Sequence, residues 1–83
     1  MAVAYVLVNV GMTQERSVQE ELLQLDGVKE AYRVYGTYDV VVKIEVENLD
    51  KLKEVVSNKV RNIENIHSTS TLIVTPSYEW GNI

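Results

Sequence analysis

Four short segments of the chain are dense in apolar residues that alternate with other residues, and two longer segments carry apolar residues at helical spacing. A period of two is typical of strands, and a recurrence every three to four residues is typical of helices. The sequence therefore predicts strands over residues 3–10, 28–35, 38–46 and 67–75, and helices over residues 14–25 and 49–62.

The ends of the two predicted helices carry residues that cap or stop helices. Thr13 precedes the first helix and can cap its free backbone N–H groups, and Asp26-Gly27 then favours a left-handed stop. Asn48 is the expected cap of the second helix. That helix presents one apolar stripe, made of Leu49, Leu52, Val56, Val60 and Ile63.

A two-residue break, Gly36-Thr37, separates the second and third predicted strands. Glycine accepts the positive φ that a type II′ turn needs at its first central position, so we expect an antiparallel hairpin here. The element order is then βαββαβ, for which short, right-handed connections favour a ferredoxin-like arrangement. The expected class is α+β, with a four-stranded antiparallel sheet covered by two helices on one face.

The first strand is apolar on both sides, so the sheet face away from the helices also carries apolar side chains, among them Val3, Tyr5 and Leu7. The last strand repeats this pattern. Because a large apolar patch usually marks an interface, we expect two copies to pack sheet to sheet as a dimeric α+β barrel. The alternative is that the C-terminal tail, with Tyr78 and Trp80, folds over this face.

Length and composition narrow the function classes. The chain is long enough for one domain, which we place at residues 1–76, followed by a tail at residues 77–83. It has no cysteine and one histidine, so no metal or other cofactor is expected. The net charge of −4 and the scattered basic residues argue against direct DNA binding. No segment approaches the ~20 apolar residues of a membrane span, and we expect a cytoplasmic protein without membrane contact.

One candidate site is the segment Gly36, Thr37, Tyr38 and Asp39, where an acidic residue opens an otherwise apolar strand. The Asp39 carboxylate suits the ammonium group of an α-amino acid, and Gly36 allows backbone amides to approach the carboxylate of such a ligand. The simpler interpretation is that Asp39 satisfies amides of the turn.

A second candidate is the pair Thr69 and Thr71 on the last predicted strand. Residues two apart on a strand point to the same face, so this pair offers two hydroxyl groups. The simpler interpretation is that threonine is a good strand former on a half-exposed face.

Three runs of residues, Leu25 to Val28, Val34 to Ile44 and Ile66 to Val74, follow one another over nearly the whole chain. In this order and spacing they resemble the ligand-sensing domain of the Lrp/AsnC transcription regulators, the RAM domain for regulation of amino acid metabolism. The resemblance implies a ferredoxin-like fold, dimers formed through the sheets, and rings of dimers, commonly octamers or decamers. It also implies amino-acid effectors held at the contact between dimers.

Carried over by position, the turn from Gly36 to Asp39 would wrap the polar end of the effector, with Asp39 taking its ammonium group. Thr69 and Thr71 match strand positions whose hydroxyls would contact the effector. Family regulators carry an N-terminal helix-turn-helix domain, whereas the first strand here begins at residue 3. The resemblance therefore implies a stand-alone sensing module that modulates transcription regulation by itself or by assembling with full-length Lrp/AsnC regulators.

Two other functions share this topology. A small dimeric α+β-barrel enzyme, such as a cofactor-free monooxygenase or isomerase, would use His67 as its one obvious base. We expect no enzyme, because an isolated histidine at a strand edge is usually an exposed polar residue. The other is an amino-acid-binding domain of the ACT type, in which the Gly36 to Asp39 hairpin would not bind the ligand.

Overall fold

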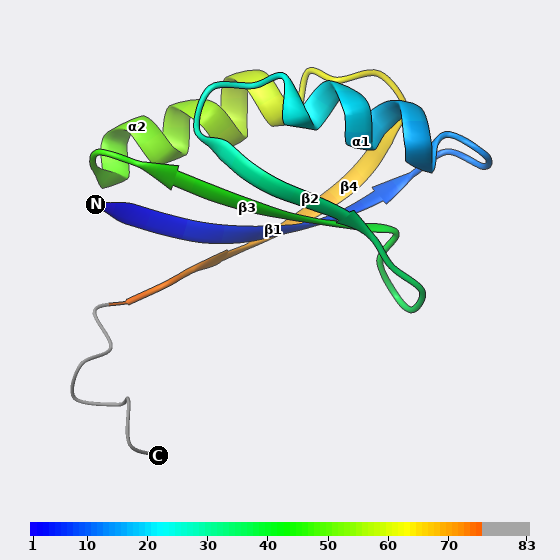
Figure 1. Ribbon diagram of the computed structural model, residues 1–83, viewed down its shortest axis with the longest axis horizontal. Coiled ribbons are helices and arrows are strands. Elements are labelled where there is room, and N and C mark those ends of the chain that lie inside the picture. The colour runs from blue at the N-terminus through cyan, green and yellow to red at the C-terminus, as the bar shows by residue number, and fades with distance from the viewer. Residues whose placement is uncertain (76–83) are drawn as a thin grey trace, which may run out of the picture.

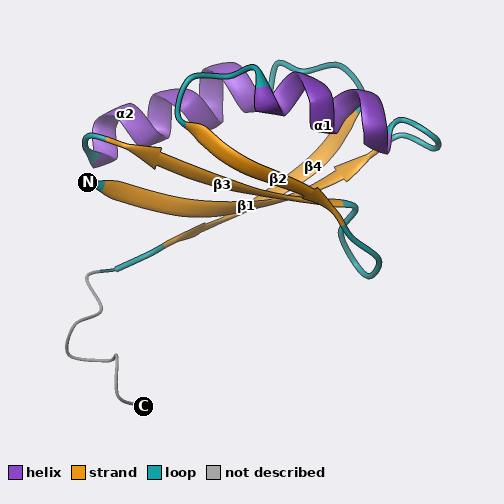
Figure 2. Cartoon of the chain, viewed as in Figure 1, coloured by secondary structure: helices purple, strands orange, loops and turns teal. Residues whose placement is uncertain are grey.

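The computed structural model describes residues 1–75 and has the expected ferredoxin-like α+β fold. One antiparallel sheet has the strand order β2-β3-β1-β4, and both helices lie on the same face of it (Figures 1 and 2). Along the chain the elements are β1 (Ala2–Val10), α1 (Glu15–Leu23), β2 (Val28–Arg33), β3 (Val40–Val46), α2 (Leu49–Glu54), the π-helical segment η1 (Val55–Val60) and β4 (Ile66–Ile73).

The core lies between the helices and the two central strands. Alternate residues of β1 and β3 are fully buried there, and the cross-strand pairs Val6–Val42 and Val8–Val40 form its floor. In β3 buried residues alternate with less buried ones, as the period of two predicted for a strand requires. The helices close the core from above with the buried side chains Val18, Leu22, Leu52, Val55 and Val60.

Helix α1 begins without the expected side-chain cap. Its N-cap residue is Gln14, which makes no side-chain cap hydrogen bond, and the prediction that Thr13 caps the helix is wrong. Thr13 instead has a φ of 66°, so it forms part of the turn before the helix rather than its cap. At the other end α1 stops at Leu23, with Gln24 as a right-handed C-cap, so the predicted stop at Asp26-Gly27 lies too late. Gly27 does have a positive φ, 93°, but it belongs to the turn into β2.

The second helix begins as predicted but changes its winding halfway. The Asn48 side chain accepts a hydrogen bond of 2.8 Å from the Lys51 backbone N–H, which confirms the cap. After α2 the chain forms the π-helical segment η1, where bonds to the fifth preceding residue put Val55 and Val60 on the same buried side. The predicted stripe is therefore wrong at Leu49, which is 45% exposed, and it omits Val55.

The hairpin between β2 and β3 is longer than expected. The strands are antiparallel neighbours as predicted, but the last bond of the ladder runs from the Val34 N–H to the Asp39 carbonyl at 2.9 Å. Four residues, 35–38, therefore lie in the loop, and the two-residue type II′ turn at Gly36-Thr37 is wrong. The loop projects away from the helices (Figure 1).

The sheet face opposite the helices carries a partly exposed apolar strip. Tyr5 is 38% exposed and its cross-strand partner Leu72 is 53% exposed, with Val74 further along the same side. The alternative cover by Tyr78 and Trp80 concerns a segment outside the described residues. Within residues 1–75, no helix is long and apolar enough to cross a membrane.

Candidate functional site

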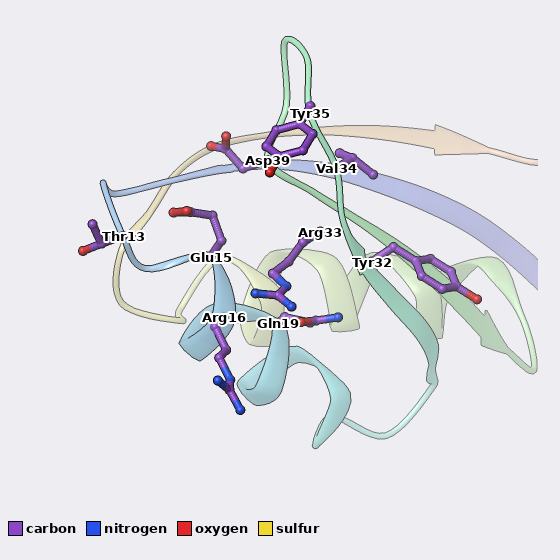
Figure 3. Close-up of a pocket in the computed structure, with 9 residues that line it drawn as sticks. All are labelled: Thr13, Glu15, Arg16, Gln19, Tyr32, Arg33, Val34, Tyr35 and Asp39. Atoms are coloured by element: carbon purple, nitrogen blue, oxygen red, sulfur yellow. The ribbon is translucent and has the colours of Figure 1, made fainter.

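An open pocket of about 580 Å³ lies at the β2 edge of the sheet. The start of α1 forms one wall, and the end of β2 with the hairpin loop forms the other (Figure 3). The pocket is lined by Thr13, Glu15, Arg16, Gln19, Tyr32, Arg33, Val34, Tyr35 and Asp39.

Asp39 lies on the hairpin wall of the pocket and bonds to the central strand β1. Its backbone N–H donates to the Val8 carbonyl at 2.9 Å, and its carboxylate Oδ2 accepts from the Val10 N–H at 3.0 Å. The carboxylate thus satisfies a backbone amide, as the simpler interpretation held, but the amide belongs to β1 and not to the turn. The second oxygen, Oδ1, makes no hydrogen bond within residues 1–75, which leaves one acceptor of this half-buried side chain for a ligand.

The α1 wall is fixed to the edge strand by a side-chain amide. Gln19 Nε2 donates to the Ala31 carbonyl at 2.7 Å, which leaves the Gln19 side-chain oxygen as an acceptor. Arg16, in the same helix, forms an ion pair with Glu20 at 3.5 Å and is 79% exposed. The pocket therefore combines carboxylates, guanidinium groups and an amide held in place.

Contacts among polar and charged side chains of β2 and β3 perturb titration. The Tyr32 hydroxyl donates to Glu30 Oε1 at 2.5 Å, and this bond to a carboxylate raises the pKa of Tyr32 above its usual value. Lys43 lies 3.3 Å from the Glu45 carboxylate and 3.7 Å from that of Glu30. The contact with Glu45 is the main cause that raises the pKa of Lys43.

The residues expected to form a site lie in two places. Asp39 lines the pocket, whereas Gly36 and Thr37 are exposed in the projecting loop, outside the pocket lining, and Tyr38 is half-buried beside them. No atom beyond its chain neighbours lies within 4 Å of a Cβ added at Gly36, so this position faces open space.

Thr69 and Thr71 lie on β4, at the opposite edge of the sheet. They pair with Val8 and Val6, so both point to the helix side. Thr69 Oγ1 accepts a 3.4 Å hydrogen bond from Arg61 Nε beside a small hollow of about 240 Å³. Asp39 leads into β3, and two strand spacings of ~4.8 Å, about 10 Å, separate β3 from β4 across β1. Within one chain the two groups do not form a common pocket.

Sequence reasoning missed the contribution of Glu15, Gln19 and Arg33 to the pocket. The spacing of Glu15 and Gln19 places them on one side of a helix, but nothing along the chain indicates that this side meets the end of β2. Among the described residues, no group of three or more potential metal ligands gathers at this or any other place.

A protein-family model described as the Lrp/AsnC ligand binding domain matches residues 3–79. The regulatory protein AsnC of Escherichia coli is 41% identical over 58 residues, which are 70% of this chain and 38% of that protein. An uncharacterised helix-turn-helix-type transcriptional regulator of Pyrococcus furiosus is 34% identical over 79 residues, which are 95% of this chain and 53% of that protein. The chain thus spans about half the length, or less, of these relatives.

Solved structures agree with the fold. A hypothetical protein from Pyrococcus horikoshii superimposes with a TM-score of 0.87 at 38% identity, and the match covers 98% of both chains. A transcriptional regulator from Neisseria meningitidis, solved as a complex with L-methionine, has a TM-score of 0.80 over 93% of this chain and 51% of that one. At 10% identity the latter match bears on the fold alone.

These findings settle the class of protein. The named relatives are transcriptional regulators and not enzymes, so the barrel-enzyme alternative with His67 as base has no support, and the expectation of a non-enzymatic protein is confirmed. The family match covers nearly all of the described residues and includes every helix and strand, apart from the first residue of β1. The chain belongs to the Lrp/AsnC ligand-binding domain family.

Proposed function

We propose that this chain binds a small amino acid as an effector, and that binding modulates transcription regulation by changing how copies of the domain assemble. The observation that carries this proposal is the pocket at the β2 edge. In a domain of a ligand-binding family, this pocket presents carboxylates and guanidinium groups on facing walls. An α-amino acid carries the two complementary charges on adjacent groups, so it fits such a lining.

Asp39 and the hairpin form one side of the proposed site. The carboxylate of Asp39 receives the ammonium group through Oδ1, while Oδ2 remains on the Val10 amide. The exposed amides of Gly36 and Thr37 approach the effector only if the loop moves or a neighbouring copy brings its own loop, because neither residue lines the pocket.

The hydroxyls of Thr69 and Thr71 complete the site from a second copy. Within one chain neither threonine lines the pocket that holds Asp39, so an effector in this pocket would meet these hydroxyls only on a second copy. Two side chains at the pocket end also support a contact between copies: Met12 is 90% exposed and Tyr35 is fully exposed, each at a loop tip. A second copy packed against this end would remove both side chains from water, which is favourable.

The basic assembly unit is a dimer that buries the apolar strip of Tyr5, Leu72 and Val74 between two sheets. Because this strip faces away from the helices and the pocket opens at the sheet edge, a sheet dimer leaves the pocket free for contacts between dimers. We propose that contacts at this free edge join dimers into rings, such as octamers or decamers, or into mixed assemblies with full-length Lrp/AsnC regulators. The N. meningitidis regulator, which shares this fold, was solved as a complex with an amino acid, L-methionine.

Calorimetric titration of the twenty L-amino acids, with mass photometry of the same samples, tests this function. We expect at least one amino acid to bind and to shift the distribution of assembly sizes. Asp39→Asn keeps an acceptor for the Val10 amide but removes the charge, so it should lose effector binding and keep the dimer. Asp39→Ala should lose binding as well, and the exposed Asp26→Ala serves as the matched control. If no amino acid binds at millimolar concentration, the proposed function is wrong.

A further inference from the structure

We propose that Arg33 anchors the carboxylate of the effector and that Glu15 shares its ammonium group with Asp39, which makes the pocket a clamp for a zwitterion within a single chain. This inference rests on the proposed function and names the groups that read the two charges of the ligand. It assigns a role to two residues that neither the hairpin motif nor the strand-four threonines include.

Arg33 stands at the pocket as an unpaired cation. It is the last residue of β2 and pairs with the buried Val40, so its side chain leaves the edge strand on the helix side. Figure 3 shows this side chain extending from β2 toward α1. Within residues 1–75 it takes part in no ion pair, and a guanidinium group offers a planar fork of donors that matches a carboxylate.

Glu15 supplies a matching anion on the facing wall. It is the first residue of α1, half-buried, and it makes no ion pair or side-chain hydrogen bond with the described part of the chain. Figure 3 places its carboxylate on the same side of the pocket as that of Asp39. Since one Asp39 oxygen already accepts from the Val10 amide, Glu15 is the less committed of the two carboxylates.

The other groups of the pocket fit these roles less well. Arg16 also lines the pocket, but it is paired with Glu20 at 3.5 Å and is mostly exposed. The loop amides at Gly36 lie outside the lining, so they do not provide a carboxylate site in a single chain. Arg33 is therefore the cation best placed to hold a ligand carboxylate while Asp39 and Glu15 hold its ammonium group.

Calorimetry on the intact chain tests the clamp. The twenty L-amino acids are titrated first, and each one that binds is then compared with its methyl ester, which keeps the ammonium group but lacks the negative charge. A charge-assisted hydrogen bond at an open site predicts that Arg33→Gln weakens binding of the free amino acid about tenfold or more and leaves the ester unaffected. Arg33→Lys should restore part of the loss, and Lys53→Gln, exposed on α2, is the matched control.

The variant Glu15→Gln tests the other half of the clamp. It should lower the affinity for both the amino acid and its ester several-fold, because both ligands carry the ammonium group. The matched control is the exposed Glu21→Gln in the same helix, which should bind both ligands as the unmodified chain does. If Arg33→Gln binds the amino acid with unchanged affinity, or if its affinity for the amino acid and for the ester falls equally, the clamp is wrong. Amino-acid binding by the chain would still stand. If the unmodified chain binds no amino acid, the proposed function fails and the clamp fails with it.

Discussion

The connection between α1 and β2 depends on a glycine that no other residue can replace without strain. Gly27 has a φ of 93°, and its carbonyl accepts a 2.8 Å hydrogen bond from the Glu45 N–H. A Cβ added there would lie 2.7 Å from Val46 Cγ1, well inside van der Waals contact. Gly27→Ala therefore introduces two separate costs, one in the backbone and one in packing.

The two costs have known sizes. A non-glycine residue with a left-handed backbone conformation costs about 1–2 kcal/mol, and an extra carbon in a packed site costs typically about 1–3 kcal/mol. Together they predict that Gly27→Ala lowers the free energy of unfolding by about 2–5 kcal/mol. A domain of this size has a total of about 4–12 kcal/mol, so the variant should be severely destabilised.

Urea unfolding at a fixed protein concentration measures this loss, and a double-mutant cycle with Val46→Ala separates the packing part. Val46→Ala removes the methyl group that the new Cβ would meet, so the double variant should be less destabilised than the sum of the single variants. Gly36→Ala is the control: its φ of 139° predicts backbone strain, but with no atom within 4 Å it should show no coupling to Val46→Ala. Additive costs in the Gly27 cycle would refute the steric argument.

Three further predictions address the helix cap, the sheet face and titration. Asn48→Ala should lower the free energy of unfolding by about 1 kcal/mol, because the Lys51 amide loses its hydrogen-bond acceptor. An unchanged urea midpoint would contradict this. Leu72→Glu should dissociate the proposed sheet dimer in sedimentation experiments, and a persistent dimer would place the interface elsewhere. Because the pKa of Lys43 is raised, mainly by Glu45, this pairing should stabilise the fold at neutral pH and lose its effect as pH rises past about 10.5. Glu45→Gln should reduce that pH dependence of the unfolding free energy in urea titrations, and an unchanged dependence would contradict the pairing.

The strands were predictable because burial repeats along them with the period of the backbone. In β3, Val40, Val42 and Ile44 are buried as the alternation predicts, because this central strand pairs with β1 in an unbroken register. In β2 the ladder shifts register between Val28 and Glu30, so Ala31 pairs with Val42 and faces the core. A register shift of this kind depends on the pairing with the partner strand, so it cannot be predicted from the hydrophobic period of β2 alone.

The apolar stripe predicted for the second helix and the cap predicted for the first were partly wrong, each for a physical reason. A stripe counted at 100° per residue assumes α-helical winding throughout, but η1 winds more widely and brings Val55 and Val60 to the core together. Thr13 failed as a cap because tertiary contacts, here the bond from the Gly11 N–H to the Asn65 carbonyl, set the course of the chain before the helix.

The candidate site was predictable only where one residue was out of place in its own segment. Asp39 stood out as an acid at the start of an apolar strand, and it does line the pocket. Glu15 and Arg33 are ordinary at their positions, a charged residue in a first helical turn and another at a strand end. Their importance arises only when α1 packs beside β2, which is a property of the fold and not of either segment.

The position of the pocket bears on how an effector can act on assembly. A ligand shifts an equilibrium only if it binds one state more tightly than the other. A clamp made entirely of Glu15, Arg33 and Asp39 would bind equally well in a dimer and in a ring, so by itself it would change nothing in the assembly. The hydroxyls of Thr69 and Thr71, from the opposite sheet edge of another copy, would supply the difference. Removing them should therefore leave part of the affinity intact while abolishing the effect of the amino acid on assembly size.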